Sequence, residues 1–261
     1  MVKEELSQMG SASVYLTEYQ GVECIRKLGA SPIELSFYQH SAPLLRQAGV
    51  NIPDLIHADG TDLYIEFIPN PIALNELNQT DDVYRQISII HSLNLESPPY
   101  LKTHEWSLAK THSAFQILNL PSASQAVLTH IQTQSRCLFS PATLISGDTN
   151  DGNWGRRNTG ELVLFDWERF GYGSPAIDLA PLVKGMGCRA DYESVIERYL
   201  KHSTAQSAGE LLRQLVMAKA WIVIDVVNLL VERNNPMKGK YIDWFNENLP
   251  YWLDETAVAS V

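Results

Sequence analysis

The chain has 261 residues, 45% of them hydrophobic and 19% charged, so it carries enough apolar material for a sizeable core and is not intrinsically disordered. Lys and Arg number 20 against 30 Asp and Glu, and the resulting charge of −10 argues against a nucleic-acid-binding surface. The cysteines, Cys24, Cys137 and Cys188, are odd in number and form no CxxC pair, which argues against a disulfide framework or a structural zinc site.

The first third of the chain is predicted to form a small sheet with one helix. Alternating residues and turn signals predict strands at 13–19, 22–28, 54–58 and 62–67. Between the second and third strands, Ser31-Pro32 opens a helix that runs to about Ala48, because serine caps free N–H groups and proline fits the first turn. Pro69-Asn70-Pro71 then breaks the pattern and predicts a hinge between two lobes.

Beyond this hinge the helical period dominates. The predicted helices are 81–93, 105–118, 122–135, 175–185, 190–202, 206–233 and 239–247, interrupted by a short β hairpin at 142–145 and 162–165. The sequence therefore predicts an α+β chain with a small β-rich lobe, 1–68, and a larger, mostly helical lobe, 69–261.

We expect a cytoplasmic protein that binds no membrane. The start of the chain lacks the apolar core of a signal peptide. The most apolar long segment, 211–231, carries more polar side chains than a membrane span tolerates.

Three oxygen-bearing side chains are predicted to meet at one end of the short hairpin. Asp148 follows its first strand, Asn153 comes five residues later, and Asp166 ends its second strand. Such a set suits magnesium (Mg2+), a hard ion that takes few protein oxygens and keeps sites for phosphates and water. Phosphoryl transfer needs such an ion, together with a carboxylate near the attacking hydroxyl.

This stretch resembles the catalytic segment of the aminoglycoside phosphotransferase and choline kinase superfamily, which has the protein-kinase-like fold. The matching motifs are Ser146-Gly147-Asp148 with Asn153, Phe165-Asp166-Trp167-Glu168, and Gly173-Ser174-Pro175-Ala176-Ile177-Asp178-Leu179-Ala180. The resemblance implies that Asp148 is the catalytic carboxylate, that Asn153 and Asp166 hold magnesium, and that Asp178 is a structural anchor.

One residue departs from the family pattern. Ser146 stands where the family usually has a histidine that braces the catalytic loop. Serine donates only one hydrogen bond and fills less space. A catalytically weak or inactive kinase-like nucleotide-binding protein is therefore the alternative reading, whereas the retained Asp148, Asn153 and Asp166 favour an active enzyme.

The resemblance also places nucleotide-binding residues in the front lobe. It puts Ser11 and Ser13 in a turn, Gly10-Ser11-Ala12-Ser13, whose backbone N–H groups face phosphate. On the strand predicted at 22–28, the alternation Cys24-Ile25-Arg26 resembles the family pattern and favours Arg26 as the phosphate-binding cation. Lys27 is the rival, because a shift of one residue swaps the faces of a strand.

Two further segments complete the predicted nucleotide site. Glu34 resembles the helix glutamate that holds the cation, although a first-turn charge favoured by the helix dipole is the alternative. The segment containing Glu66 and Ile68 resembles the hinge strand, whose backbone bonds to adenine.

The resemblance implies an enzyme that transfers the γ-phosphoryl group of ATP to a hydroxyl of a small molecule. Aminoglycosides, choline, amino alcohols and sugars are the acceptors of the superfamily, and an acidic chain with six tryptophans is compatible with a cationic acceptor.

A competing dinucleotide-binding fingerprint is present at Gly171-Tyr172-Gly173-Ser174-Pro175-Ala176. Its sequence context does not fit, because 185–202 predicts a loop and a helix where a βαβ unit needs a strand.

Overall fold

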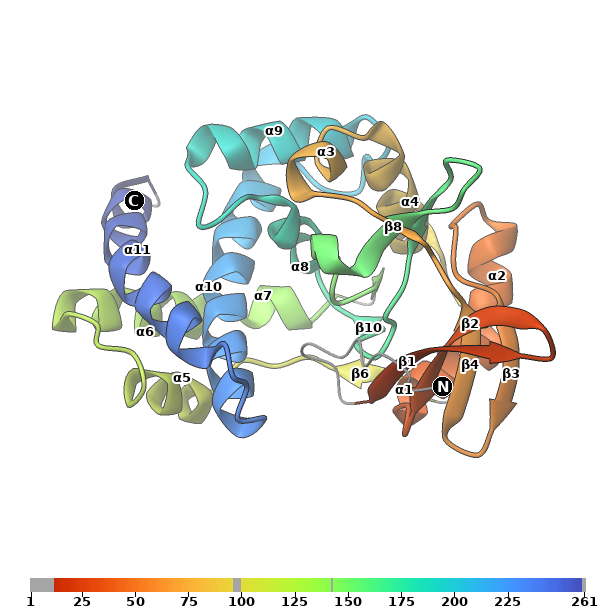
Figure 1. The fold of residues 1–261 in the computed structure, drawn as a ribbon. Helices are drawn as coiled ribbons and strands as arrows, with labels where there is room; N and C mark the ends of the chain where they lie inside the picture. Colours follow the sequence, from red (N-terminus) through yellow and green to blue (C-terminus); the bar gives the residue numbers. More distant parts are fainter. Residues whose placement is uncertain (1–11, 96–99, 142, 260–261) are drawn as a thin grey trace. The chain divides into compact units, whose positions relative to one another are not determined.

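The computed structural model describes residues 12–95, 100–141 and 143–259, with side chains up to residue 255. The chain forms two compact units, Met1–Thr103 with Thr143–Tyr172, and His104–Ala142 with Gly173–Val261. The described strands all lie in the first unit, and the second unit is helical (Figure 1). This arrangement confirms the predicted α+β class. The functional division into lobes at residue 68 stays a prediction.

A four-stranded antiparallel sheet begins the first unit. Its strands are β1 (Ser13–Tyr19), β2 (Val22–Leu28), β3 (Leu55–Asp59) and β4 (Asp62–Glu66), in the order β1-β2-β4-β3. In β4, Leu63 and Ile65 are buried and Tyr64 between them is half-buried, which is the alternation of a sheet with one covered face. The predicted strands are therefore confirmed to within one residue at each end.

The predicted helix 32–48 is a continuous helical segment with a π-helical middle. It consists of α1 (Pro32–Ser36), η1 (Phe37–Ser41) and α2 (Ala42–Gln47). At its start the Oγ atom of Ser31 accepts a hydrogen bond of 3.1 Å from the backbone N–H of Glu34. This cap fixes Glu34 in the first helical turn.

The prediction that 142–145 pairs with 162–165 is wrong. The strand β7 (Leu144–Ile145) pairs with β10 (Gly171–Tyr172), whereas β9 (Leu162–Leu164) pairs with β8 (Trp154–Arg156). The two sheets are completed by β6 (Lys102–Thr103), in the order β6-β10-β7, and by β5 (Asn70–Pro71), in the order β5-β8-β9. Strands of two or three residues are too short to show an alternation of apolar and polar residues, so their pairing partners could not be predicted from the sequence.

The first glycine of the dinucleotide-like fingerprint has a packing role. Gly171 lies opposite Lys102 in a parallel pair, and a Cβ atom at Gly171 would collide with the carbonyl oxygen of Lys102. In the described part of the chain, no strand follows α8 (Pro175–Leu179). The segment is therefore not a βαβ dinucleotide unit.

The remaining helix of the first unit with more than one turn is α4 (Asp81–Ser92), preceded by α3 (Leu74–Leu77). The second unit contains α5 (Leu108–Phe115), α6 (Ser122–Gln134), α7 (Arg136–Phe139), η3 (Ala180–Leu182), α9 (Arg189–Leu200), α10 (Ala208–Glu232) and α11 (Lys238–Ala259) besides α8. The α11 helix continues well past the predicted end at residue 247.

Asp178, the expected structural anchor, is completely buried in α8.

The long helix α10 is the centre of the second unit and contacts α5, α6, α8, α9 and α11 (Figure 1). By length and composition alone it qualifies as a membrane span, but 56% of its most apolar stretch is buried within the protein. A core helix meets the same criteria, so this finding is weak evidence for a membrane.

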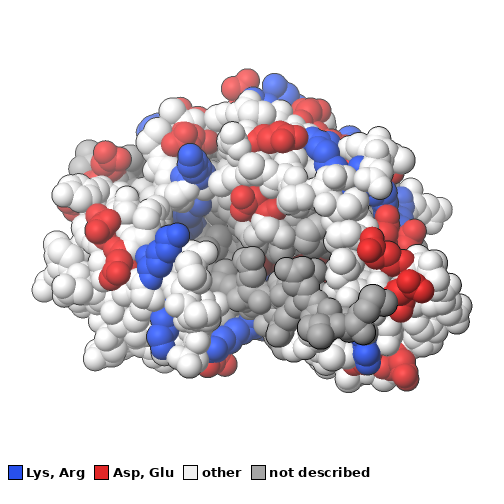
Figure 2. Space-filling view, in the orientation of Figure 1, with Lys and Arg blue, Asp and Glu red and all other residues white. Residues whose placement is uncertain are grey.

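Charged side chains of both signs are interspersed on the face shown in Figure 2. On the surface, charged side chains form local pairs, such as Arg189 with Glu193 at 2.7 Å on α9. Exposed pairs of this kind contribute little to stability.

Candidate active site

One ammonium group in the first unit lies between two carboxylates. Nζ of Lys27 on β2 is 2.5 Å from Oε1 of Glu34 on α1 and 2.8 Å from Oδ1 of Asp166, which follows β9. The side chains of Glu34 and Lys27 are 1% and 9% exposed, whereas that of Asp166 is 28% exposed. The more accessible carboxylate is therefore Asp166.

Burial and charge act in opposite directions on this group. Burial alone would lower the pKa of Lys27, but the charges of Glu34 and Asp166 outweigh it and hold the pKa above its ordinary value. Burial raises the pKa of Glu34, Lys27 opposes this only in part, and the nearby negative charge of Asp166 raises the pKa further. Lys27 thus stays positively charged, with its side chain fixed at two points.

The backbone at Asp166 and the ring that follows it fix the position of this carboxylate. Asp166 has a φ of +67°, a left-handed conformation that is uncommon outside glycine. The next residue, Trp167, is completely buried, stacks on Phe37 and donates a hydrogen bond of 3.2 Å from Nε1 to the carbonyl oxygen of Leu164. The sharp turn therefore sends the Trp167 ring into the core while Asp166 faces Lys27.

A second loop, after β7, presents Asp148. Nδ2 of Asn150 donates a hydrogen bond of 2.6 Å to Oδ1 of Asp148, and Oδ1 of Asn150 accepts one of 2.8 Å from the backbone of Gly152. Nδ2 of Asn153 donates a bond of 3.0 Å to the backbone carbonyl of Asp148. Both asparagines thus hold the Asp148 loop in one conformation.

The environment of Asp148 suits a group that accepts a proton. Burial raises its pKa, which Arg169 and the bond from Asn150 partly oppose, and the nearby charge of Asp166 raises it further. The interaction between Asp148 and Asp166 shows that their two loops bring negative charge to the same region.

The donor atoms of this region fit a magnesium ion. Because the amide nitrogen of Asn153 bonds to the Asp148 carbonyl, its oxygen is the atom left to act as a ligand. Among the described residues no three His, Cys, Asp or Glu side chains gather into a metal-binding group. Such a cation would therefore rely on Asp166, on the Asn153 amide and on non-protein oxygens, which is how magnesium is usually bound.

A family model of the phosphotransferase enzyme family matches residues 11–214, which is most of the chain and includes both loops. The chain belongs to the phosphotransferase enzyme family. The expected kinase-like fold and the resemblance to choline kinases and aminoglycoside phosphotransferases are thereby confirmed. A search of curated proteins found no match.

Solved structures share the fold at low sequence identity. The choline kinase LicA from Streptococcus pneumoniae aligns with a TM-score of 0.68 and 15% identity, over 97% of this chain and 94% of that one. A choline/ethanolamine kinase family protein from Mesorhizobium loti has a TM-score of 0.66 and 15% identity, with coverages of 97% and 88%. The APH(2")-IIa protein in its gentamicin complex has a TM-score of 0.61 and 16% identity, with coverages of 93% and 90%.

The expectation that Arg26 faces Glu34 is wrong. Nη2 of Arg26 is 2.7 Å from Oδ2 of Asp62, and its guanidinium lies 5.4 Å from the centre of the Tyr64 ring. Arg26 shares a face of β2 with Cys24, whereas Lys27 lies on the face toward Glu34. The predicted alternation along β2 therefore assigns the cation to the residue before the correct one. Lys27, the alternative candidate, is the cation that forms the ion pair with Glu34.

The other nucleotide-site candidates are placed as follows. Ser13 is the first residue of β1, and Ser11 lies outside the described residues. The side chain of Glu66, at the end of β4, forms an ion pair of 2.7 Å with Arg157. Ile68 lies next to β8, where its Cγ2 atom faces Gly155. Whether the backbone of Glu66 and Ile68 binds adenine stays a prediction.

Sequence reasoning missed Asn150 and Arg157. The run Asn150-Asp151-Gly152 carries a recognisable signal, because asparagine often bonds the backbone two residues on. Arg157 gives no such signal, since its partner is 91 residues away.

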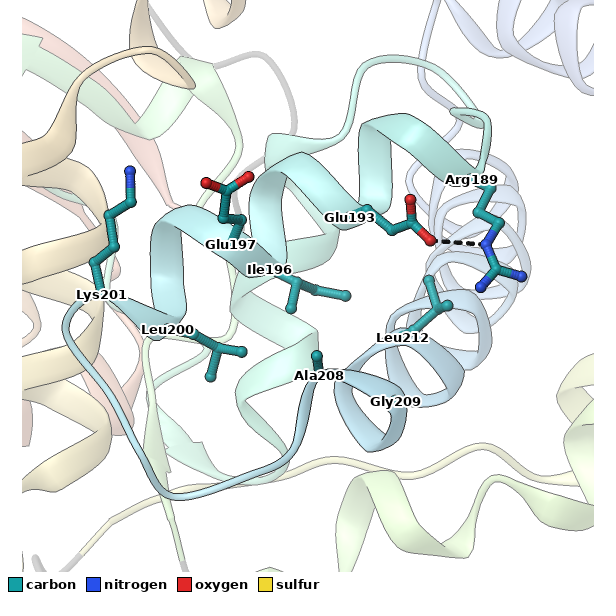
Figure 3. Close-up of a pocket in the computed structure, with 9 residues that line it drawn as sticks. All are labelled: Arg189, Glu193, Ile196, Glu197, Leu200, Lys201, Ala208, Gly209 and Leu212. Atoms are coloured by element: carbon teal, nitrogen blue, oxygen red, sulfur yellow. Dashed lines mark hydrogen bonds and ion pairs between the residues drawn. The ribbon is translucent and has the colours of Figure 1, made fainter.

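The second unit has a separate hollow of about 460 Å³ between α9 and α10 (Figure 3). Its lining is formed by Arg189, Glu193, Ile196, Glu197, Leu200, Lys201, Ala208, Gly209 and Leu212. None of these is a predicted site residue, so the hollow is not the candidate active site.

Proposed function

We propose that this protein transfers the γ-phosphoryl group of ATP to a hydroxyl of a small molecule. The observation that carries the proposal is the Lys27 ammonium held by Glu34 and Asp166 in a chain of the phosphotransferase enzyme family. A cation fixed in this way is preorganised for phosphate, because its position is set before the ligand arrives. Structures of two relatives hold AMP and GDP, which supports a nucleotide as donor.

Each residue of the site has a role in this reaction. Asp148 orients the acceptor hydroxyl and takes its proton as the new bond forms, and its raised pKa suits that task. Asn150 holds the Asp148 carboxylate at 2.6 Å, so that the attacking oxygen meets it in one orientation. Lys27 binds phosphate oxygens and Glu34 keeps it in place.

Asn153 and Asp166 would hold magnesium, which when bound neutralises charge on the phosphate oxygens. Positioning and electrostatics supply most of the rate in phosphoryl transfer. The two loops therefore matter chiefly because they hold Asp148 and Asp166 in fixed positions.

For the acceptor we propose a small alcohol with a positive charge, such as an amino alcohol or an aminoglycoside. The names of the structural relatives include choline, ethanolamine and gentamicin, which are all cationic alcohols. The fold alone does not select among them.

The experiment that tests the proposal is an ATP-consumption screen with magnesium over amino alcohols, aminoglycosides, sugars and hydroxy amino acids. We expect consumption with at least one acceptor, and we expect it to fall by orders of magnitude in Asp148→Asn while nucleotide binding survives. The matched control is Asp151→Asn, a carboxylate three residues away in the same loop. Wild-type turnover in Asp148→Asn would contradict the role of Asp148.

Ser146 supports a second candidate, a kinase-like protein that binds nucleotide without turnover. The family histidine is replaced by a completely buried serine directly before the catalytic loop. Nucleotide binding with no consumption of ATP across the whole acceptor screen would favour this candidate, and turnover with any acceptor would exclude it.

A further inference from the structure

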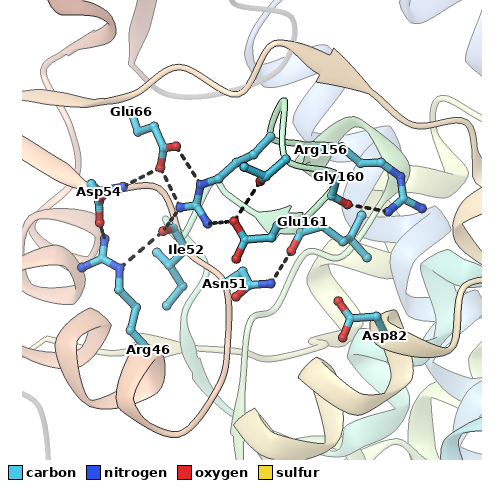
Figure 4. A network of polar contacts seen from close by, with 12 residues as sticks. Arg46, Asn51, Ile52, Asp54, Glu66, Asp82, Arg156, Gly160 and Glu161 are labelled. Atoms are coloured by element: carbon cyan, nitrogen blue, oxygen red, sulfur yellow. Dashed lines mark hydrogen bonds and ion pairs between the residues drawn. The ribbon is translucent and has the colours of Figure 1, made fainter.

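The end of strand β4 is tied to the β8–β9 hairpin by a two-point ion pair. Nε and Nη2 of Arg157 each donate a hydrogen bond of 2.7 Å, to Oε1 and Oε2 of Glu66 respectively. Figure 4 labels the Glu66 carboxylate at the centre of these contacts. The side chains are 21% and 26% exposed. A planar guanidinium bound to both carboxylate oxygens fixes direction as well as distance, which a single contact would not.

The same arginine also fixes the loop before β3. Nη2 of Arg157 donates a bond of 3.2 Å to the carbonyl oxygen of Ile52, and the backbone N–H of Asp54 donates one of 3.2 Å to Oε2 of Glu66. Arg46 donates a hydrogen bond to the carbonyl oxygen of Ile52 as well (Figure 4). Arg46 also bonds the carbonyl oxygen of Pro53. Glu66 and Arg157 are therefore the centre of a polar network.

Backbone packing continues this connection toward the site. The strand β5 pairs with β8, with Asn70 opposite Arg156. A Cβ atom at Gly155 would lie 2.8 Å from Cγ2 of Ile68 and 3.1 Å from the carbonyl oxygen of Asn70, so only glycine allows this approach. The segment from Glu66 to Asn70 is thus held against the hairpin along its length.

The far end of that hairpin carries the proposed magnesium ligands. Asn153 directly precedes β8, and Asp166 follows β9 after one residue. The backbone N–H of Phe165 bonds the carbonyl oxygen of Asn153 at 3.0 Å, which joins the two ligand positions. A displacement of the hairpin therefore moves both ligands together.

We propose that Arg157 is a positioning residue for the nucleotide. With Glu66 it sets the distance between the segment 66–68, where the base would bind, and the ends of β8 and β9, where the phosphates and magnesium would bind. This inference rests on the proposed function. One nucleotide must reach both places at once, so a shift between them costs binding of the whole molecule.

The electrostatics agree with this geometry. Partial burial pushes the pKa of Glu66 upward, but the hydrogen bonds from Arg157 outweigh it and lower the pKa. Glu66 is therefore ionised over the working range of pH, and the pair with Arg157 persists.

The test compares nucleotide affinity in full-length Arg157→Gln and Arg156→Gln. Arg156 is the adjacent residue on the same hairpin, but its ion pair is a partly exposed contact of 3.4 Å to Glu76, away from Glu66, which makes it a matched control. We expect the Kd for ADP with magnesium, measured by calorimetry, to rise about tenfold in Arg157→Gln and less than twofold in Arg156→Gln. The KM for ATP should rise equally with kcat nearly unchanged, as for a uniform loss of binding.

Two further variants separate positioning from folding. Glu66→Gln keeps the size of the side chain and should weaken ADP binding in the same direction. The exchange of both residues, Glu66→Arg with Arg157→Glu, should recover part of the lost affinity. A lower melting temperature with an unchanged Kd, well below that temperature, would overturn the proposal and leave Arg157 only a structural role.

The outcomes also separate this proposal from the proposed function. Failure of the wild-type protein to bind ADP or ATP would contradict the proposed function, and the role of Arg157 with it. Equal binding by wild-type protein and Arg157→Gln would contradict the role of Arg157 alone.

Discussion

Trp167 stacks on Phe37 with ring centroids 4.1 Å apart and ring planes inclined by 10°. The two rings belong to the segments that carry Asp166 and Glu34, the two carboxylates that share the Lys27 ammonium. The apolar contact therefore sets the spacing of the charged groups.

We predict that Trp167→Ala destabilises the protein by about 3–5 kcal/mol, because it removes a completely buried ring and leaves a cavity. Urea unfolding followed by circular dichroism measures the loss. Tyr251→Ala is the control, since this ring is 77% exposed and its removal should change stability by no more than about 0.5 kcal/mol. A similar loss of unfolding free energy in both variants would contradict a stabilising role for the packing of the Trp167 ring.

We predict that Lys27→Met abolishes phosphate binding and also destabilises the fold, because Glu34 is left buried without its ammonium partner. ATP turnover should fall at least about 100-fold. The double variant Lys27→Met with Glu34→Leu should regain stability but not turnover, since it removes the unpaired buried charge.

The neighbouring Arg26→Met tests whether the strand face is assigned correctly. The ion pair of Arg26 with Asp62 has side chains 32% and 23% exposed and is worth roughly 0–1 kcal/mol. Turnover should stay within about threefold of wild type. If Arg26→Met lost activity and Lys27→Met kept it, the phosphate-binding role would pass to Arg26.

We predict that Asn150→Ala lowers kcat by about 10–100-fold with little change in the KM for ATP, because it frees the Asp148 carboxylate to rotate and uncaps the loop. Steady-state kinetics with saturating acceptor measures both constants. Asn158→Ala, in an exposed turn of the same unit, is the control. A change in KM without a change in kcat would argue against an orienting role.

We predict that Lys219 makes stability depend on pH. Its Nζ atom donates to the carbonyl oxygens of Ala180 and Val183 at 2.8 and 2.7 Å, and burial lowers its pKa to about 7 from an ordinary 10.5. Between these values the unfolded chain binds more protons than the folded one, so stability rises with pH. The slope is at most about 1.4 kcal/mol per pH unit.

Urea unfolding of wild-type protein and Lys219→Met at pH 6.5, 8 and 9 isolates this contribution. The free energy of unfolding of the wild type relative to the variant should increase across the series, because methionine cannot take up a proton. A difference that is the same at all three pH values would contradict a lowered pKa for Lys219.

Local patterns in the sequence predicted the parts of this protein that depend on neighbours in the chain. The β1–β2 hairpin and the long helices follow from periods and turn residues, and the loops of Asp148 and Asp166 follow from motifs with fixed spacing. The choice between Arg26 and Lys27 was different, because consecutive residues of a strand face opposite ways and only the packed helix with Glu34 decides between them.

The pairing of the short strands depends on contacts far apart in the chain. Two-residue strands such as β5 and β10 carry no period, and Gly155 within β8 interrupts any alternation. The role of Arg157 could not be predicted for the same reason. The residues around an arginine in a turn do not indicate whether its side chain is exposed or bound to a distant partner such as Glu66.

The ion pair between Glu66 and Arg157 has a consequence for synthesis on the ribosome, because its members are 91 residues apart. The β1–β4 sheet is translated long before the hairpin that completes its polar network. At about 5–20 residues per second, the nascent sheet waits on the order of 5–20 s for that partner. Until Arg157 is made, the Glu66 carboxylate lacks the partner that binds both of its oxygens, so the end of β4 is held less firmly than in the finished protein.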